Sequence, residues 1–185
     1  MNSPAFPNIS LQLKEIESGL SAYICPKSGG VWIPLQNYLA WQATHRIINS
    51  QTPDKYEPLQ VADSKQPTLL CPESGRLLIR YRVGHGLNFH IDHSPVTGGV
   101  WLDKGEWEAL KSKGLHVELN LIFTASYQRA IRSAEYQQAL EQSFRDRIGS
   151  ADFQKVLEFK NWLTDRPNQR DICCYLLNNV TDRVE

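Results

Sequence analysis

Apolar and polar residues alternate over residues 77–83, and this period of two is typical of a β-strand with one buried face. Glycine-rich residues 84–88 follow directly, so the pattern predicts a β-hairpin that turns there. The predicted inward-facing positions of the strand are Leu77, Ile79, Tyr81 and Val83.

The same order of elements is predicted twice, because the phrase Gly-Gly-Val-Trp at residues 29–32 recurs at residues 98–101. Each copy reads as a turn, a strand, a hairpin, a strand, a second turn, a short strand and a helix. In the second copy Asp103 can cap the helix and Glu106 can complete a capping box. In the first copy Pro34 suits the first position of the equivalent helix.

The pattern becomes helical from Leu115 onward. Ser133 can cap one helix and Ser150 can cap a second, and the motif of Asn168 with Asp171 can start a third. The second of these helices carries a broad apolar stripe, made of Phe153, Val156, Leu157, Phe159, Trp162 and Leu163.

Two prolines and many polar residues at 49–66 indicate a surface linker between the copies. We therefore expect four parts along the chain. They are a first module at 1–48, a linker at 49–67, a second module at 68–113 and a helical region at 114–185.

Charge and composition narrow the class of protein. The 20 Lys and Arg residues balance 20 Asp and Glu residues, so no excess positive charge drives non-specific binding to nucleic acid. A hydrophobic fraction of 41% excludes wholesale disorder. No apolar window reaches the roughly 18 residues of a membrane helix, and residues 1–9 do not resemble a secretion signal. The four cysteines do not resemble a disulfide framework, and we expect reduced thiols in a cytoplasmic protein.

Residues 97–106, with the sequence Thr-Gly-Gly-Val-Trp-Leu-Asp-Lys-Gly-Glu, resemble the second knuckle of the TFIIB-type zinc-ribbon family. The first copy keeps only the Cys-Pro and Gly-Gly-Val-Trp elements of that pattern. The resemblance covers about residues 3–110. It implies an α+β fold of two small zinc-ribbon-like β modules, each followed by a helix and fused by the C-terminal helices.

The resemblance also assigns four metal-ligand positions to each copy. They are Ser3, Phe6, Cys25 and Ser28 in the first copy, and Cys71, Ser74, Ser94 and Thr97 in the second. A structural zinc site takes four Cys or His ligands, but each copy keeps one thiol. We therefore expect neither copy to hold zinc, and we predict no cofactor. Hydroxyl hydrogen bonds and apolar packing must then replace roughly 10–16 kcal/mol of metal-dependent folding free energy.

A displaced zinc site is an alternative, because several imidazoles lie close together in the sequence. If zinc is bound, Cys71 and His93 are the first candidate ligands, followed by His90 and Cys25. No nucleophile paired with a base, no phosphate loop and no dinucleotide motif is present, so the sequence does not favour an enzyme.

The favoured interpretation is a non-enzymatic adaptor or assembly factor that binds another protein. Trp32, Trp101 and Trp162 are expected in the core, whereas Trp41 and Trp107 are candidate anchors for a protein partner. The first alternative is a nucleic-acid or transcription-complex binding module that uses Arg80 and Arg82. The second alternative is a zinc-dependent regulator. No contact with a membrane is expected.

Overall fold

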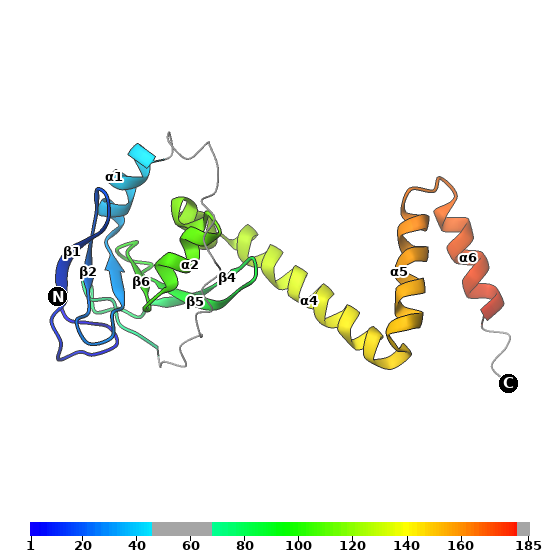
Figure 1. The fold of residues 1–185 in the computed structure, drawn as a ribbon, viewed down its shortest axis with the longest axis horizontal. Coiled ribbons are helices and arrows are strands. Elements are labelled where there is room, and N and C mark those ends of the chain that lie inside the picture. The colour runs from blue at the N-terminus through cyan, green and yellow to red at the C-terminus, as the bar shows by residue number, and fades with distance from the viewer. Residues whose placement is uncertain (46–67, 181–185) are drawn as a thin grey trace. The chain divides into compact units, whose positions relative to one another are not determined.

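The structure is a computed structural model that describes residues 1–45 and 68–180, so the predicted linker at 49–67 lies outside the described residues. The described elements follow the predicted order (Figure 1). The first repeat contains β1 (Gln12–Glu17), β2 (Leu20–Ile24), β3 (Val31–Ile33) and α1 (Leu35–His45). The second contains β4 (Ile79–Gly84), β5 (Leu87–His93), β6 (Val100–Leu102) and α2 (Glu106–Ser112).

The helical region begins with a short 3-10 helix, η1 (Leu115–Glu118). It continues with α3 (Leu119–Ile122), α4 (Ala125–Ile148), α5 (Ser150–Thr164) and α6 (Gln169–Val180). Together with the antiparallel strands, these helices confirm the predicted α+β class.

The strands form one six-stranded sheet in the order β1-β2-β3-β6-β5-β4. The two repeats meet where β3 pairs with β6 in antiparallel register, so that Trp32 lies opposite Trp101. The sheet therefore joins the repeats directly, and η1 and α3 at the start of the predicted helical region also pack against both repeats in the larger core. The short last strand of each repeat has unpaired backbone groups on one side, and the other repeat satisfies them.

The Gly-Gly-Val-Trp phrases explain how closely the repeats approach. A Cβ atom on Gly30 would lie 2.3 Å from Cζ2 of Trp101, and one on Gly99 would lie 2.2 Å from Cζ2 of Trp32. Each second glycine thus leaves room for the indole of the other repeat. Both tryptophans are fully buried, as the sequence predicts for them.

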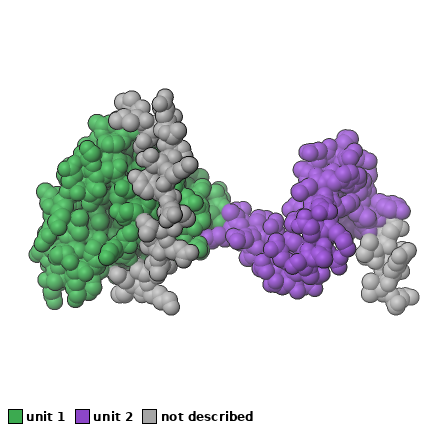
Figure 2. Space-filling view, in the orientation of Figure 1, with its two compact units in different colours: residues 1–132 green, residues 133–185 purple. Residues whose placement is uncertain are grey.

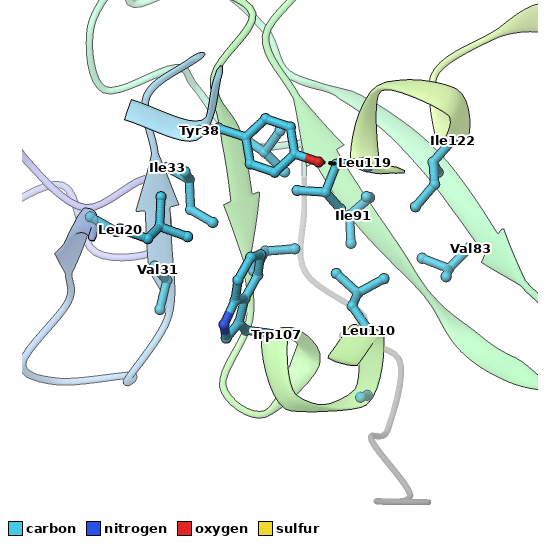
Figure 3. Close-up of a cluster of buried hydrophobic side chains, with 14 of the residues drawn as sticks. Leu20, Val31, Ile33, Tyr38, Val83, Ile91, Trp107, Leu110, Leu119 and Ile122 are labelled. Carbon is cyan, nitrogen blue, oxygen red and sulfur yellow. Dashed lines mark hydrogen bonds between the residues drawn. The ribbon is translucent and has the colours of Figure 1, made fainter. Parts of the chain in front are cut away.

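One face of the sheet packs against α1, α2 and α3 and forms the larger core. Strand residues such as Val31 and Ile91 belong to this core together with helix residues such as Leu110 and Ile122 (Figure 3). The hydroxyl of Tyr38 on α1 accepts a hydrogen bond from the backbone N–H of Leu119 at 3.0 Å.

The opposite face of the sheet carries a smaller core. Side chains alternate along a strand, so Trp32 and Trp101 point away from the larger core. They pack with Cys25, Cys71 and Leu78, in the turns that precede the strands. The indole N–H of Trp32 donates to Glu73 at 2.8 Å, and that of Trp101 donates to Asp103 at 3.0 Å.

The start of α4 is attached to the edge strand β4. The hydroxyl of Tyr127 donates to the carbonyl of Val83, and the side-chain amide of Gln128 donates to the carbonyl of Arg82, both at 2.8 Å. Ile131 lies over Gly84, where an added Cβ would be 2.9 Å from the isoleucine side chain. These contacts fix the first two turns of α4.

The chain divides into two compact units, residues 1–132 and residues 133–185 (Figure 2). The first unit contains both repeats, η1, α3 and the first turns of α4. The second contains the rest of α4 with α5 and α6. We refer to the second as the helical unit.

Local details differ from the sequence predictions. Helix α4 begins at Ala125 rather than at Ser133, because the hydroxyl of Thr124 accepts a hydrogen bond from the Tyr127 amide. Glu106 reaches back to the amide of Asp103 as predicted, at 2.7 Å. The carboxylate of Asp103 does not cap the helix, since it accepts the Trp101 indole instead.

Strand β4 begins at Ile79, whereas the alternating pattern begins at Leu77. Leu77 and Ile79 are exposed, whereas Leu78 is buried in the smaller core. The alternation places Tyr81 and Val83 against the larger core, and this part of the prediction is confirmed. The turn before β4 therefore sets which side chain is buried at residues 77–79.

Candidate functional site

The four predicted ligand positions of the second repeat lie around one sulfur atom. The Thr97 hydroxyl lies 3.6 Å from Sγ of Cys71, and the amide of Ser74 donates to the same sulfur at 3.4 Å. The hydroxyl of Ser94 also hydrogen-bonds to this thiol. Cys71 and Ser94 are both buried. The turns thus converge as the resemblance implies, with hydroxyls at three of the four positions.

Hydrogen bonds within this cluster lower the pKa of the Cys71 thiol. The Thr97 hydroxyl accepts from the Gly99 amide at 3.4 Å and the Ser94 hydroxyl accepts from the Thr97 amide at 3.2 Å, so both can donate to sulfur. Burial alone raises the pKa of Cys71. Hydrogen bonds led by the Ser74 and Ser94 hydroxyls outweigh burial and lower the pKa below its usual 9.0.

The first repeat has a similar cluster with one apolar member. Burial raises the pKa of the Cys25 thiol, but hydrogen bonds from Ser28 and Ser3 outweigh it and lower the pKa. The fourth position is Phe6, whose ring faces the ammonium of Lys27 at 4.2 Å. A phenyl ring supplies no metal ligand. This cluster therefore has one thiol and two hydroxyls.

These donor sets do not fit a structural zinc ion. Zinc in such sites takes thiolate or imidazole at all four positions, and neutral hydroxyls are poor substitutes. The hydroxyls instead pair with backbone amides and with the remaining thiols. The clusters thus act as hydrogen-bonded turn supports.

The four alternative zinc ligands do not lie together, since Cys25 and Cys71 share the smaller core but His93 does not. Cys71 belongs to the smaller core, whereas His93 stacks on Phe123 on the opposite face of the sheet, with ring centroids 4.1 Å apart. His90 points to the other side of β5 from His93, since neighbouring side chains alternate. Within residues 1–45 and 68–180, no three His, Cys, Asp or Glu side chains are placed to hold a metal ion.

The proposed tryptophan anchors were assigned wrongly. Trp41 and Trp107 are each only 2% exposed, and their rings contact each other edge to face with centroids 5.8 Å apart. The indole of Trp107 also donates to Glu17 of β1 at 3.1 Å. Both residues belong to the larger core, because α1 and α2 pack on the sheet and on each other. Neither can anchor a partner.

The candidate nucleic-acid arginines lie on β4, opposite Asp92 and His90 of β5. Arg80 is in register with Asp92, and its Nε lies 3.6 Å from the carboxylate of that residue. Arg82 is in register with His90. The buried carboxylate of Asp92 offsets the positive charge of Arg80, so β4 does not present an uncompensated positive surface at this position.

The helical unit exposes many large apolar side chains, and the predicted stripe on α5 includes only some of them. Of its described large apolar side chains, only Phe153 and Leu163 are buried. The exposed ones, which we call the helical surface, are Tyr136, Phe144, Ile148, Val156, Phe159, Trp162, Tyr175, Leu176 and Leu177.

Trp162 was expected in the core, but its side chain is 47% exposed. The stripe predicted on α5 is divided, because only part of it faces the rest of the helical unit. On α4, large apolar residues recur every four positions, at Tyr136, Leu140, Phe144 and Ile148. This helical period could have revealed the surface from the sequence.

Arginine guanidinium groups lie over three aromatic rings of the helical unit. The guanidinium of Arg147 lies 4.4 Å from the ring centroid of Phe144, and that of Arg166 lies 4.8 Å from Trp162. Arg145 lies 5.1 Å from the buried ring of Phe153. Aromatic and arginine side chains are the types enriched at binding hot spots.

Comparison of the chain with protein-family models, with curated proteins and with solved structures gave no match. None of the described helices is long and apolar enough to cross a membrane.

Proposed function

We propose that the chain is a non-enzymatic adaptor or assembly factor that binds another protein through the helical surface. In this proposal its two repeats are zinc ribbons that have lost their metal. The observation that carries the proposal is that the helical unit exposes most of its large apolar side chains. A monomeric protein rarely leaves so many such groups in water without a partner.

The free energy gained by covering apolar side chains favours binding of a partner protein to the helical surface. Isolated helices shorter than about 12–15 residues are marginal in water, and helices gain most of their stability from packing. Full burial of a fully exposed large apolar side chain contributes roughly 1.5–3 kcal/mol, and these side chains are 39–69% exposed, so each can contribute a part of that. A partner that covers several of them therefore stabilises both the complex and the helices.

The polar side chains of the first unit support a structural role rather than a catalytic one. The carboxylates of Glu73, Asp103 and Glu17 each accept an indole N–H. Asp92 pairs with Arg80. These groups hold the two repeats and their helices in place.

Affinity purification from the native lysate tests this function, with nuclease treatment in every arm. Tyr136→Asp changes the helical surface on α4, where the side chain is 65% exposed. Leu13→Asp is the matched control, since Leu13 is 60% exposed on β1 of the first unit. We expect the wild type and the control to retain the same protein, and Tyr136→Asp to retain at least about tenfold less.

Equal retention by Tyr136→Asp would contradict the proposal. Loss of the bound material on nuclease treatment would instead favour nucleic-acid binding, as would a steep fall of affinity between low and moderate salt.

A further inference from the structure

Helix α4 carries a row of large apolar side chains within the helical unit. The row consists of Tyr136, Leu140, Phe144 and Ile148, and we call it the α4 row. Leu140 is half-buried, and the other three side chains are exposed. At 1.5 Å of rise per residue, the row is about 18 Å long. Side chains four residues apart form a ridge on a helix, and such a ridge packs between the ridges of a second helix.

Two arginines flank the C-terminal end of the α4 row. Successive residues turn by about 100° around a helix, so Arg147 lies about 60° from Phe144 on one side and Arg145 about 100° from it on the other. The guanidinium of Arg147 lies 4.4 Å from the ring centroid of Phe144. That of Arg145 lies 5.1 Å from the ring centroid of Phe153 on α5. The rings thus hold one cation on each side of the row.

Neither arginine has a carboxylate partner in the part of the chain that the structure describes. No described Asp or Glu oxygen lies within 4.0 Å of either guanidinium. The side chains of Glu135 and Asp146 project from the opposite side of α4, at about 180° and 160° from Phe144. Glu141 lies on the same side as Arg145, one turn earlier, but forms no ion pair with it. Two guanidiniums beside an apolar row therefore remain available for carboxylates from outside the chain.

We propose that the α4 row binds an amphipathic helix of a partner protein whose apolar face is flanked by Asp and Glu side chains. This proposal rests on the proposed function and names the kind of partner that the α4 part of the helical surface takes. The apolar face of the partner helix covers the row, and its carboxylates accept hydrogen bonds from the two guanidiniums. A guanidinium that lies over a ring still presents the N–H groups at its rim for bidentate pairing with a carboxylate.

An acidic protein helix fits this surface better than nucleic acid does. Phosphates would also pair with Arg145 and Arg147, but a sugar–phosphate backbone would not cover the aliphatic side chains of Leu140 and Ile148. The formal net charge of the chain is zero, so general attraction to a polyanion is weak. Side chains of a protein helix match both the apolar row and the cations beside it.

Fluorescence anisotropy of the full chain with labelled peptides tests the proposal. The acidic probe is a helical peptide of about 18 residues, with Leu along one face and Glu on both sides of that face. The control probe carries Lys in place of Glu. We expect the acidic probe to bind with a dissociation constant on the order of 10 µM, and the basic probe to bind at least about tenfold more weakly.

Equal or tighter binding of the basic probe would overturn the proposal, as would no binding of the acidic probe up to about 1 mM. An RNA or DNA oligonucleotide that displaces the acidic probe at a lower concentration than unlabelled acidic peptide would also overturn it. That result would assign the two arginines to nucleic acid instead.

Charge reversal tests whether the two arginines contribute to binding. Arg145→Glu combined with Arg147→Glu should weaken binding of the acidic probe at least about tenfold. Lys160→Glu combined with Arg170→Glu is the matched control, because these side chains are also exposed in the helical unit and the change in net charge is the same. The control should change the dissociation constant by less than about threefold. Equal weakening in both double variants would overturn the proposal, because a general charge effect would explain it.

Circular dichroism checks that both double variants keep their helix content. Arg145→Gln combined with Arg147→Gln provides a second test without added negative charge, and it should also weaken binding of the acidic probe. Unchanged binding in this variant would overturn the proposal.

The acidic partner and the proposed function fail separately in the affinity purification. We expect the double reversal of Arg145 and Arg147 to reduce retention of the captured protein, as Tyr136→Asp does. Loss of that protein in Tyr136→Asp with full retention in the double reversal would overturn the acidic partner and leave the proposed function intact.

Discussion

Two glycines and two tryptophans determine how closely the repeats pack. Gly30 and Gly99 are the second glycines of their phrases, and each faces the indole of the other repeat. Their backbones do not have the positive φ angles found at other glycines of the chain. The need for glycine at these positions is therefore steric and depends on Trp101 and Trp32.

Gly99→Ala should destabilise the fold by about 3 kcal/mol, because its Cβ would overlap the Trp32 ring and the packed core cannot expand freely. Urea unfolding measures this change. Combining it with Trp32→Phe, which removes the overlapping ring, should cost about 1–2 kcal/mol less than the sum of the two single changes.

Gly75→Ala is the matched control, because Gly75 has a φ of 67° but no neighbour within 4 Å of an added Cβ. It should cost only about 1–2 kcal/mol of left-handed backbone strain. Strictly additive effects of Gly99→Ala and Trp32→Phe would contradict the steric explanation.

A second residue-scale prediction concerns His93. Burial lowers the pKa of His93 below the usual 6.5, and its buried Nδ1 has no hydrogen-bond partner among the described residues. The unfolded chain therefore takes up a proton more readily than the folded one. The stability that depends on neutral His93 is complete above pH 6.5 and is lost as the pH falls below it.

His93→Phe should keep the stacking on Phe123 and remove this titration. We expect the variant to lose less unfolding free energy than the wild type between about pH 7.5 and pH 5. Urea unfolding at both pH values measures the difference. Parallel pH curves for the two proteins would show that His93 does not contribute.

At the scale of elements, the repeated phrase and the alternating strand were enough to predict the order of strands and helices in both repeats. The pairing of β3 with β6 could not be predicted in the same way. A strand such as Val31–Ile33 is apolar on both faces, so its pattern does not indicate which strand lies beside it. That pairing decides how the repeats are joined.

The candidate site was harder to predict than the fold. The convergence of Ser74, Ser94 and Thr97 on Cys71 follows from the turns, and the resemblance indicated it. The burial of Trp41 and Trp107 depends on two helices packing against each other, which no local pattern reports. The exposure of Trp162 likewise depends on how few neighbours the helical unit provides.

At the scale of the whole molecule, the chain combines a sheet-based unit that is stabilised by packing with a helical unit that exposes its apolar side chains. The first unit places the thiols of Cys25 and Cys71 among hydroxyls and indoles, and hydroxyls or a phenyl ring occupy the other ligand positions of both clusters. In the proposed metal-free state its stability comes from the β3–β6 pairing, the two cores and the turn hydrogen bonds. In the proposed function, the helical unit provides the surface that binds a partner protein.

Thermal unfolding of the full chain, purified without chelator and measured with and without excess chelator, tests most directly whether the repeats fold without metal. Zinc-dependent modules lose roughly 10–16 kcal/mol of folding free energy when the ion is removed. We predict a midpoint that changes by less than about 1 °C, since packing rather than coordination stabilises the sheet. Loss of the folded state in chelator, with recovery when zinc is added back, would contradict the account.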